Sequence, residues 1–297
     1  MITKGRKFIT LTVIVIVAFL LFSMSYKKEN NVKDKLIGNT ENNQKNKPKL
    51  FISGNYSQIK VCKKNINEFL LLSSDGNALI ISNIKGKTDT IVKNKKLLGN
   101  FTFDKNCKYI YYKIKDSNYR YVFKRKNILT KKTETLENIP QLTSINSFAT
   151  SNDTLFYLDK KTLQVKGYCK GNNWNITDDD KKYYNIIPSP NNKYIIAHSV
   201  SNPYIFFKNG EMIKKLNSFI VTDWSKDGNY ILGFKDISND GKTISGSDIY
   251  VFNLKDNSFT KLTNTDTVFE AWPVFITNNE IIYSDLKSGN IYIKNIK

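Results

Sequence analysis

The sequence predicts an all-β fold: a six-bladed β-propeller of four-stranded antiparallel blades, with an N-terminal transmembrane or signal helix. Three observations predict it. Strand-forming side chains dominate the apolar residues of this 297-residue chain, which include 17 Tyr and 18 Phe. A turn-and-strand unit recurs about every 42 residues. One uncharged apolar run stands near the N-terminus.

The first element is that apolar run, residues 8–24, which follows three cationic side chains. As an α-helix it would span roughly 25 Å, near the lower limit for crossing a bilayer. Cations before such a run favour a cytoplasmic N-terminus, so the rest of the chain is expected on the other side of the membrane. Residues 1–25 are therefore predicted to be a signal anchor, with a cleaved signal peptide as the alternative.

The second element, residues 26–48, is almost purely polar and is predicted to be a disordered tether. It is rich in Lys, Asn and Glu. Such a segment cannot bury enough apolar area to offset the entropy lost on ordering. The folded domain is accordingly expected to occupy residues 49–297, and the membrane contact is expected through residues 8–24.

The third element is the repeat. Short apolar runs alternate with turns rich in Asn, Asp, Gly and Ser, and no stretch keeps a 3.6-residue period. The clearest unit is residues 223–232, in which a Lys-Asp-Gly-Asn turn separates two strands. The first apolar residue after each turn marks the period at Phe69, Tyr109, Leu155, Tyr194, Tyr230 and Ile281. This spacing is that of a four-stranded blade, and six blades fill the domain.

The last blade is incomplete on its own. The sixth unit stops after its third strand, residues 290–296. Its fourth strand is expected to come from residues 50–53, at the start of the domain. This pairing would close the ring and remove the exposed sheet edges that invite aggregation.

Three motif segments stand in order in the fifth unit: Trp224-Ser225-Lys226-Asp227-Gly228-Asn229, Asp248-Ile249-Tyr250-Val251 and Lys261-Leu262-Thr263. This series resembles the WD40-like repeat of TolB-type propellers, with Lys226 where that repeat has Pro. The resemblance is strongest over residues 220–297 and implies six blades. The N-terminal α/β docking domain of TolB has no counterpart before the predicted tether, so a role in the Tol system is not implied.

Charge and cysteines add two expectations. The net charge is +20, and the excess of Lys and Arg lies before residue 223. A basic half suggests contact with lipid headgroups, an acidic glycan or an acidic protein, while a lysine-rich solvated surface is the alternative. Cys62, Cys107 and Cys169 lie in or beside different strands and are expected to be buried apolar side chains, with at most one bridge.

Catalytic and cofactor signals are missing. The one histidine, His198, cannot supply a zinc site, which needs three or four ligands, and no Gly-x-Ser-x-Gly elbow is present. His198 is expected to be packed or to line the channel. Residues 236–241 resemble the start of a calcium loop, which makes Asp236 and Asp240 the metal candidates. Ser238 and Ser247 occupy the third and twelfth positions, where calcium loops have acidic ligands, so an ordinary long turn is the alternative.

The densest basic and aromatic cluster, residues 109–126, supplies the binding candidates Arg120, Lys124, Arg125 and Lys126. Aromatic rings beside cations stack on bases or sugars, but export makes nucleic acid an unexpected partner. The same alternation also fits two strands with one solvated face.

These observations predict an exported, membrane-anchored propeller outside the cytoplasm, without cofactor or catalytic activity. It would be an interaction module for an envelope protein or for an anionic glycan or lipid surface. The alternative is a propeller hydrolase, which would need carboxylates of different blades about 5–10 Å apart in the channel. A third reading is a degenerate relative with no ligand.

Overall fold

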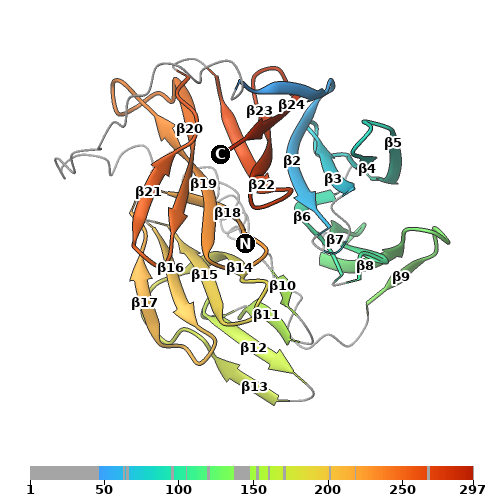
Figure 1. The fold of residues 1–297 in the computed structure, drawn as a ribbon. Coiled ribbons are helices and arrows are strands. Elements are labelled where there is room, and N and C mark those ends of the chain that lie inside the picture. Colours follow the sequence, from blue (N-terminus) through green and yellow to red (C-terminus); the bar gives the residue numbers. More distant parts are fainter. Residues whose placement is uncertain are drawn as a thin grey trace, which may run out of the picture.

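The structure is a computed structural model that describes residues 47–296 apart from positions 63, 65–66, 95–96, 105, 119–120, 137–147, 152–153, 160, 170–171, 201, 218 and 266–267. It confirms the predicted class, because six four-stranded antiparallel sheets are arranged as the blades of a ring (Figure 1). The predicted signal anchor, 1–25, and most of the predicted tether lie outside the described residues. Within the described part, no helix is long and apolar enough to cross a membrane.

Each of the first five blades uses four strands that follow one another in the sequence. Blade 1 holds β2 (Tyr56–Val61), β3 (Glu68–Ser73), β4 (Ala78–Asn83) and β5 (Thr88–Lys93). Blade 2 holds β6 (Leu97–Phe103), β7 (Tyr109–Lys115), β8 (Tyr121–Asn127) and β9 (Thr133–Thr135). Blade 3 holds β10 (Phe148–Ser151), β11 (Thr154–Leu158), β12 (Val165–Cys169) and β13 (Asn172–Asn175).

Blades 4 and 5 follow the same order. Blade 4 holds β14 (Tyr183–Pro188), β15 (Tyr194–Ser199), β16 (Pro203–Phe207) and β17 (Met212–Lys215). Blade 5 holds β18 (Ile220–Trp224), β19 (Tyr230–Ile237), β20 (Gly246–Asn253) and β21 (Ser258–Lys261). The first strand of each blade lies nearest the centre of the ring and the fourth lies outermost (Figure 1).

Blade 6 closes the ring in the way the sequence predicts. It holds β22 (Glu270–Phe275), β23 (Glu280–Asp285) and β24 (Ile291–Asn295), and its outer strand is β1 (Lys49–Ile52) from the start of the domain. The strands β1 and β24 are antiparallel, with Leu50 opposite Tyr292 and Ile52 opposite Ile291. The first folded strand is therefore hydrogen-bonded to the last.

A hairpin turn between the first two strands explains the recurring motif. In blade 5 the Ser225 hydroxyl donates to Asp227 Oδ1 over 2.5 Å and accepts from the Tyr230 amide over 2.9 Å. Blade 4 repeats this with Ser189, whose hydroxyl donates to Asn191 Oδ1 over 2.7 Å. These side chains replace water as partners for the turn backbone, so the residue types recur with the turn.

The motif residues Asp248 and Thr263 tie the segment that follows the outer strand β21 back to β20 of the same blade. Thr263 Oγ1 accepts the Ile249 amide over 2.8 Å, and Asp248 Oδ1 accepts the Thr265 amide over 3.0 Å. Blade 3 uses the same device, since Thr177 Oγ1 accepts the Val165 amide over 2.8 Å. These hydrogen bonds, which fix the path of the loop after the fourth strand, account for the Asp and Thr of the motif.

Large apolar side chains fill the spaces between neighbouring blades. Trp224 is buried between blades 4 and 5, stacks on Tyr194 with ring centroids 6.0 Å apart, and donates its indole N–H to the Ile187 carbonyl over 3.0 Å. Between blades 5 and 6 the buried core includes Leu232, Ile249, Phe275 and Tyr283. Burial of such side chains, each worth about 1.5–3 kcal/mol, holds the blades in a ring.

The structure contains the one bridge that the sequence allows, in place of the expected free apolar thiols at two positions. Cys62 and Cys107 form a disulfide, with Cα atoms 5.8 Å apart, that joins blades 1 and 2. Both residues lie at the turn after the first strand of their blade, so the repeat brings them side by side. Cys169 is free and partly buried.

Candidate functional site

The predicted basic candidates do not form one patch among the residues described. Lys124, Arg125 and Lys126 are consecutive on β8, so their side chains alternate between the two faces of blade 2. Lys126 Nζ donates to the Ile91 carbonyl of blade 1 over 2.7 Å. Arg125 instead pairs with Glu134 at 2.7 Å and lies over the Tyr109 ring, 4.8 Å from its centroid. Arg120 lies outside the described residues.

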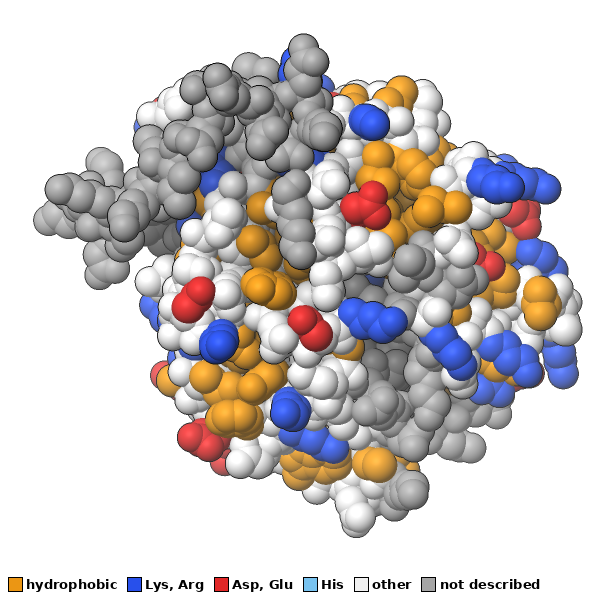
Figure 2. All heavy atoms as spheres, viewed as in Figure 1, with side chains coloured by type: hydrophobic (Ala, Val, Ile, Leu, Met, Phe, Trp, Pro, Cys, Tyr) orange, Lys and Arg blue, Asp and Glu red, His pale blue; other side chains and the backbone are white. Residues whose placement is uncertain are grey.

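Exposed lysines gather elsewhere on the same two blades. In Figure 2, Lys and Arg side chains lie along the right-hand edge, over the blades of β2–β5 and β6–β9. The exposed lysines of these blades are Lys64, Lys85, Lys87, Lys93, Lys108, Lys131 and Lys132. Lys131 is paired with Asp89 at 2.9 Å. We call this set the basic edge.

The predicted metal candidates are parts of a turn. Asp240 Oδ1 accepts the amides of Lys242 and Thr243 over 2.8 and 2.7 Å, and these hydrogen bonds lower the pKa of its carboxyl to about 2. Asp236 lies next to the end of β19, and desolvation raises its pKa to about 6 although the residue is exposed at the surface. No group of three potential metal-ligating residues occurs in the part of the chain that is described.

His198 is buried, in agreement with the expectation that it is a packed side chain. It is 3% exposed on β15, and its Nδ1 lies 3.2 Å from Asn185 Nδ2. Burial and the charge of Lys60 lower its pKa to about 3, so the ring is neutral. The enclosed ring packs against that of Tyr184, with centroids 5.7 Å apart, and its Nε2 is buried without a hydrogen-bond partner among the described residues.

The feature that sequence patterns missed is a hollow between blades 5 and 6, which we call the Glu270 cleft. Its volume is about 450 Å³. Its lining comes from the residues just before β1, the segment after β21, the start of β22 and the end of β24. Its polar lining consists of Lys47, Thr263, Asn264, Thr265, Glu270 and Lys294.

Glu270 is the chemically unusual residue of the cleft. It begins β22, is only 1% exposed, and its Oε2 has no hydrogen-bond partner among the described residues. Thr265 Oγ1, also in the lining, is likewise buried, and its hydroxyl interacts with the Glu270 carboxyl. Buried polar atoms without partners are rare in folded proteins, because each forfeits its hydration.

Burial dominates the electrostatics of Glu270. It raises the pKa of the carboxyl to about 7, and the negative charge of Asp248 adds to that effect. Hydrogen bonding from the hydroxyls of Thr263, Thr265 and Tyr283 acts in the opposite direction and lowers the pKa. Glu270 therefore changes its charge near neutral pH, whereas an unperturbed glutamate is ionised there.

Asp248, the neighbouring carboxylate on β20, is fully engaged. It is 2% exposed, its Oδ2 contacts Lys261 Nζ at 2.7 Å, and its Oδ1 accepts the Thr265 amide over 3.0 Å. This residue anchors the wall of the cleft, and only Glu270 of the two presents an unused oxygen atom.

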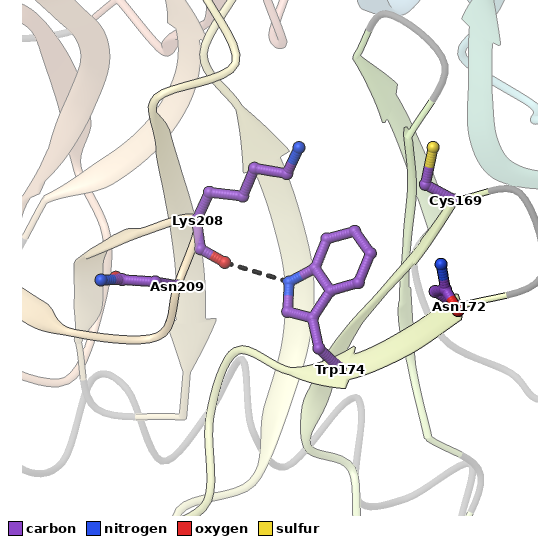
Figure 3. A pocket seen from close by; sticks show the side chains of 5 residues that line it. All are labelled: Cys169, Asn172, Trp174, Lys208 and Asn209. Carbon is purple, nitrogen blue, oxygen red and sulfur yellow. Dashed lines mark hydrogen bonds between the residues drawn. The ribbon is translucent and has the colours of Figure 1, made fainter.

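A second hollow, of about 550 Å³, lies between the outer strands of blades 3 and 4 (Figure 3). Its centre is Trp174, whose indole lies against Gly167, where a Cβ atom would come within 2.3 Å of the ring. The indole N–H donates to the Lys208 carbonyl over 3.0 Å, and Lys208 Nζ lies 5.4 Å from the ring centroid. The indole N–H is therefore already hydrogen-bonded, whereas Glu270 Oε2 is not.

Sequence reasoning missed Glu270, Thr265 and Lys294 because they belong to different strands and loops and share no motif. One signal was present. An acidic residue begins an inner strand, directly before the Ala271-Trp272-Pro273 segment that marks the sixth unit.

Comparison with solved structures supports the propeller fold. No protein-family model matches this sequence, and no curated protein matches it. Among solved structures, a protein of unknown function from Bacteroides thetaiotaomicron is 10% identical, with a TM-score of 0.59 over 85% of this chain and 72% of that one. TolB from Acinetobacter baumannii is 14% identical, with a TM-score of 0.50 over 82% of this chain. The match spans 64% of that TolB chain, and both likenesses concern the propeller fold alone.

Proposed function

We propose that this chain is an exported, membrane-tethered, non-catalytic propeller that acts as an interaction module of the cell envelope. The observation that carries the proposal is the closed ring, in which β1 completes blade 6. A closed propeller is a rigid scaffold whose loops can vary without disturbing the sheets, a common arrangement for binding. The TolB-like fold agrees with this role.

The disulfide supports export. Cys62–Cys107 links two blades, and disulfides form and persist mainly outside the reducing cytoplasm. The cationic and apolar residues of segment 1–25 supply the means of export, and the polar residues 26–48 would stand the propeller off the membrane.

The basic edge supports an anionic partner. Several exposed lysines there, such as Lys85, Lys87 and Lys132, lie on neighbouring blades. Within the set, Lys131 pairs with Asp89, and Lys132 lies 3.9 Å from Glu134. A surface of one sign attracts an acidic protein, glycan or lipid headgroup, and the attraction falls with ionic strength.

Localisation is tested with the full chain and a variant lacking residues 1–25, both expressed in a bacterial cell. We expect the full chain in the membrane fraction, with its propeller cut by protease added outside the cytoplasmic membrane. The shortened variant should remain soluble and protected inside. A full chain found soluble in the cytoplasm would contradict the proposal.

Binding is tested by retention on vesicles containing phosphatidylglycerol and on an immobilised acidic glycan. Changing Lys85, Lys87, Lys93 and Lys132 to Ser should abolish retention at about 0.1 M salt, because the basic edge loses its charge. Changing the exposed Lys193, Lys226, Lys242 and Lys255 of blades 4 and 5 to Ser removes the same number of charges and is the matched control. Equal retention of all three proteins would remove the basic edge from the proposal.

The hydrolase alternative gains no support at the Glu270 cleft. That chemistry needs two carboxylates that both reach the substrate or its water. Asp248 is enclosed and bonded to Lys261 and to the Thr265 amide, so Glu270 is the one usable acid there among the residues described.

A further inference from the structure

Two neighbouring turns of the basic edge carry exposed apolar side chains at their tips. Leu129, in the β8–β9 turn of blade 2, is 85% exposed, and Ile84, in the β4–β5 turn of blade 1, is 44% exposed. Lysines of the basic edge stand in the same two turns: Lys85, Lys87, Lys131 and Lys132. Figure 2 shows apolar side chains among the Lys and Arg side chains of this edge. Single exposed apolar residues are common, so the arrangement of the two turns decides what they mean.

Hydrogen bonds inside each turn fix its tip. In blade 2, Asn127 Oδ1 accepts the amides of Leu129 and Thr130 over 3.0 and 2.9 Å. In blade 1, Asn83 Oδ1 accepts the amide of Lys85 over 2.9 Å. Asparagine side chains that bond the turn backbone in this way hold its shape. Both apolar tips are therefore presented by ordered turns.

The two turns are also joined to each other. Lys131 Nζ pairs with Asp89 across the two blades at 2.9 Å. The turns after the first strands of the same blades are joined by the disulfide Cys62–Cys107. In each blade a backbone hydrogen bond ties the tip turn to the turn that carries the cysteine. The two tips and the lysines around them therefore belong to one rigid surface.

Lysines around apolar tips are suited to a lipid surface. Anionic headgroups attract the lysines, and Leu and Ile side chains gain free energy when they leave water for the boundary of the acyl chains. A soluble acidic glycan would satisfy the lysines but leave the tips in water. The turns and links at the opposite end of the ring carry exposed acids such as Asp75, Asp178 and Asp240, which an anionic bilayer repels. Charge therefore turns the lysine-bearing end toward the lipid.

The contact belongs to blades 1 and 2 rather than to the whole of this end. Beside the basic edge, Asp89 pairs with Lys131 and Glu134 lies 3.9 Å from Lys132, and the exposed lysines of the edge outnumber such acids. Blades 4 and 5 also have lysines in the corresponding turns, but exposed acids stand among them: Glu211, Asp227 and Asp256.

The predicted tether reaches the ring next to the basic edge. It ends at β1, the outer strand of blade 6, and blade 6 adjoins blade 1 (Figure 1). The Tyr56 amide of β2 donates to the Gly289 carbonyl of blade 6 over 2.9 Å. Fully extended, residues 26–48 would span about 75 Å, so a tether of this length lets the basic edge meet the bilayer.

We propose that the basic edge docks on the anionic surface of a lipid bilayer, with Leu129 and Ile84 inserted among the headgroups and the surrounding lysines on the lipid phosphates. This inference rests on the proposed function, because it names the partner of the basic edge and the orientation of the tethered ring. The acidic end of the ring then faces away from the membrane.

The test places an environment-sensitive dye at the tip of blade 2. The full chain with Leu129→Cys and Cys169→Ser is labelled with a nitrobenzoxadiazole dye without reducing agent. It is then reconstituted into phosphatidylcholine vesicles with or without phosphatidylglycerol. At about 0.1 M salt we expect a shift of the emission to shorter wavelength, and quenching by nitroxide-labelled lipids, only with phosphatidylglycerol. A dye that stays in water in both kinds of vesicle would overturn the proposal.

The control is the same dye at Met212→Cys, also with Cys169→Ser. Met212 is 55% exposed at the start of β17, in blade 4. It lies away from the basic edge, so the dye there should remain in water on both kinds of vesicle. Equal shifts at the two positions would show that the basic edge does not direct the contact.

Further variants of the chain labelled at residue 129 separate charge from insertion. Changing Lys85, Lys87, Lys93 and Lys132 to Ser should remove the shift. Ile84→Ser should lower the ratio of docked to undocked chains about fivefold, because one inserted side chain is lost, and Ile84→Leu should keep it. If Ile84→Ser docks as well as Ile84→Leu, the tip of blade 1 is not inserted and the proposal fails for that contact.

The outcome separates this inference from the proposed function. If the dye stays in water while protease cuts the propeller outside the cytoplasmic membrane, lipid docking is wrong and the tethered module stands. If the dye enters the lipid but the propeller is found in the cytoplasm, export is wrong and the docking surface stands.

Discussion

Glu270 joins two properties that a single side chain rarely combines: it is almost fully enclosed, and it titrates near neutral pH. The folded chain keeps the proton on Glu270 up to a pKa of about 7, whereas the unfolded chain releases it near 4.5. Unfolding between these values releases a proton, so rising pH favours the unfolded state.

We therefore expect the free energy of unfolding to contain a contribution from Glu270 that is full below pH 4.5 and lost by about pH 7. Its size is on the order of 3 kcal/mol. Denaturant unfolding of the wild type and of Glu270→Gln from pH 4 to pH 8 measures it. The Gln variant should lack this decline. The change Glu211→Gln, at an exposed position, is the control, and a Glu270→Gln variant with an undiminished decline would show that the carboxyl titrates normally.

Gly228 and Asn192 occupy the same place in the first hairpin turn of blades 5 and 4. Both have positive φ, +74° and +58°, and both donate their amide to the serine carbonyl that begins the turn. A Cβ atom at Gly228 would also come within 2.4 Å of Asn191 Nδ2. Glycine adopts this conformation without strain, and asparagine adopts it more readily than other residues with side chains.

Gly228→Ala should lower the free energy of unfolding by about 1–2 kcal/mol, because it adds a Cβ in a left-handed turn. Asn192→Gly, at the matching position, should leave stability within about 0.5 kcal/mol of the wild type. Equilibrium unfolding of the two variants under one condition makes the comparison. Similar losses in both would mean that the two turns are not equivalent.

At the scale of elements, the disulfide links the turn after β2 to the turn after β6. It closes a loop of 45 residues, which is one repeat of the propeller. Chain-entropy arguments give such a bridge about 2–4 kcal/mol of stabilisation, mainly through the unfolded state. The replacement of both Cys62 and Cys107 by Ser should lower the unfolding midpoint accordingly, and a reducing agent should have the same effect on the wild type.

Cys169→Ser is the matched control, because that cysteine is free. Its unfolding midpoint should equal that of the wild type in the absence of a reducing agent. If dithiothreitol leaves the wild-type midpoint unchanged and mass measurement finds three free thiols, the bridge is absent and one support for export goes with it.

The elements show which parts of the structure the sequence predicts. Turn residues such as Ser225, Asp227 and Gly228 act within a few residues of one another, so their spacing carries the blade period and the blade number. The disulfide could have been found from the same period, since Cys62 and Cys107 stand one repeat apart. The expectation of apolar cysteines treated each residue alone and missed the register between blades.

The Glu270 cleft could not be predicted from the spacing of sequence motifs, for a physical reason. Glu270 and Thr265 stand on either side of the passage from one blade to the next, and Lys294 lies two strands further on. Their proximity depends on how blades 5 and 6 pack, which no local pattern records. The basic candidates failed to gather for the opposite reason, because neighbours on β8 point to opposite faces.

At the scale of the whole molecule, the ring is closed by strands from the two ends of the folded domain. β1 is short, with only Lys49–Ile52, and it pairs with β24 alone. The tether predicted for residues 26–48 leads directly into this strand, so membrane attachment and ring closure meet at the same point. Closure also covers the edge of β24, which would otherwise be open to pairing with another chain.

The most direct test of this closure is disulfide trapping between β1 and β24. Leu50 and Tyr292 are opposite each other, so the double variant Leu50→Cys, Tyr292→Cys, with Cys169→Ser, has Cα atoms within the range of a disulfide. The pair Leu50→Cys, Lys294→Cys, shifted by two residues, is the control and lies too far for efficient bridging. Mild oxidation at low protein concentration should give a monomer in which mass spectrometry finds residues 50 and 292 joined, with little product from the shifted pair. A monomer without the bridge, a bridge only between two chains, or equal yields from both pairs would contradict the closed ring.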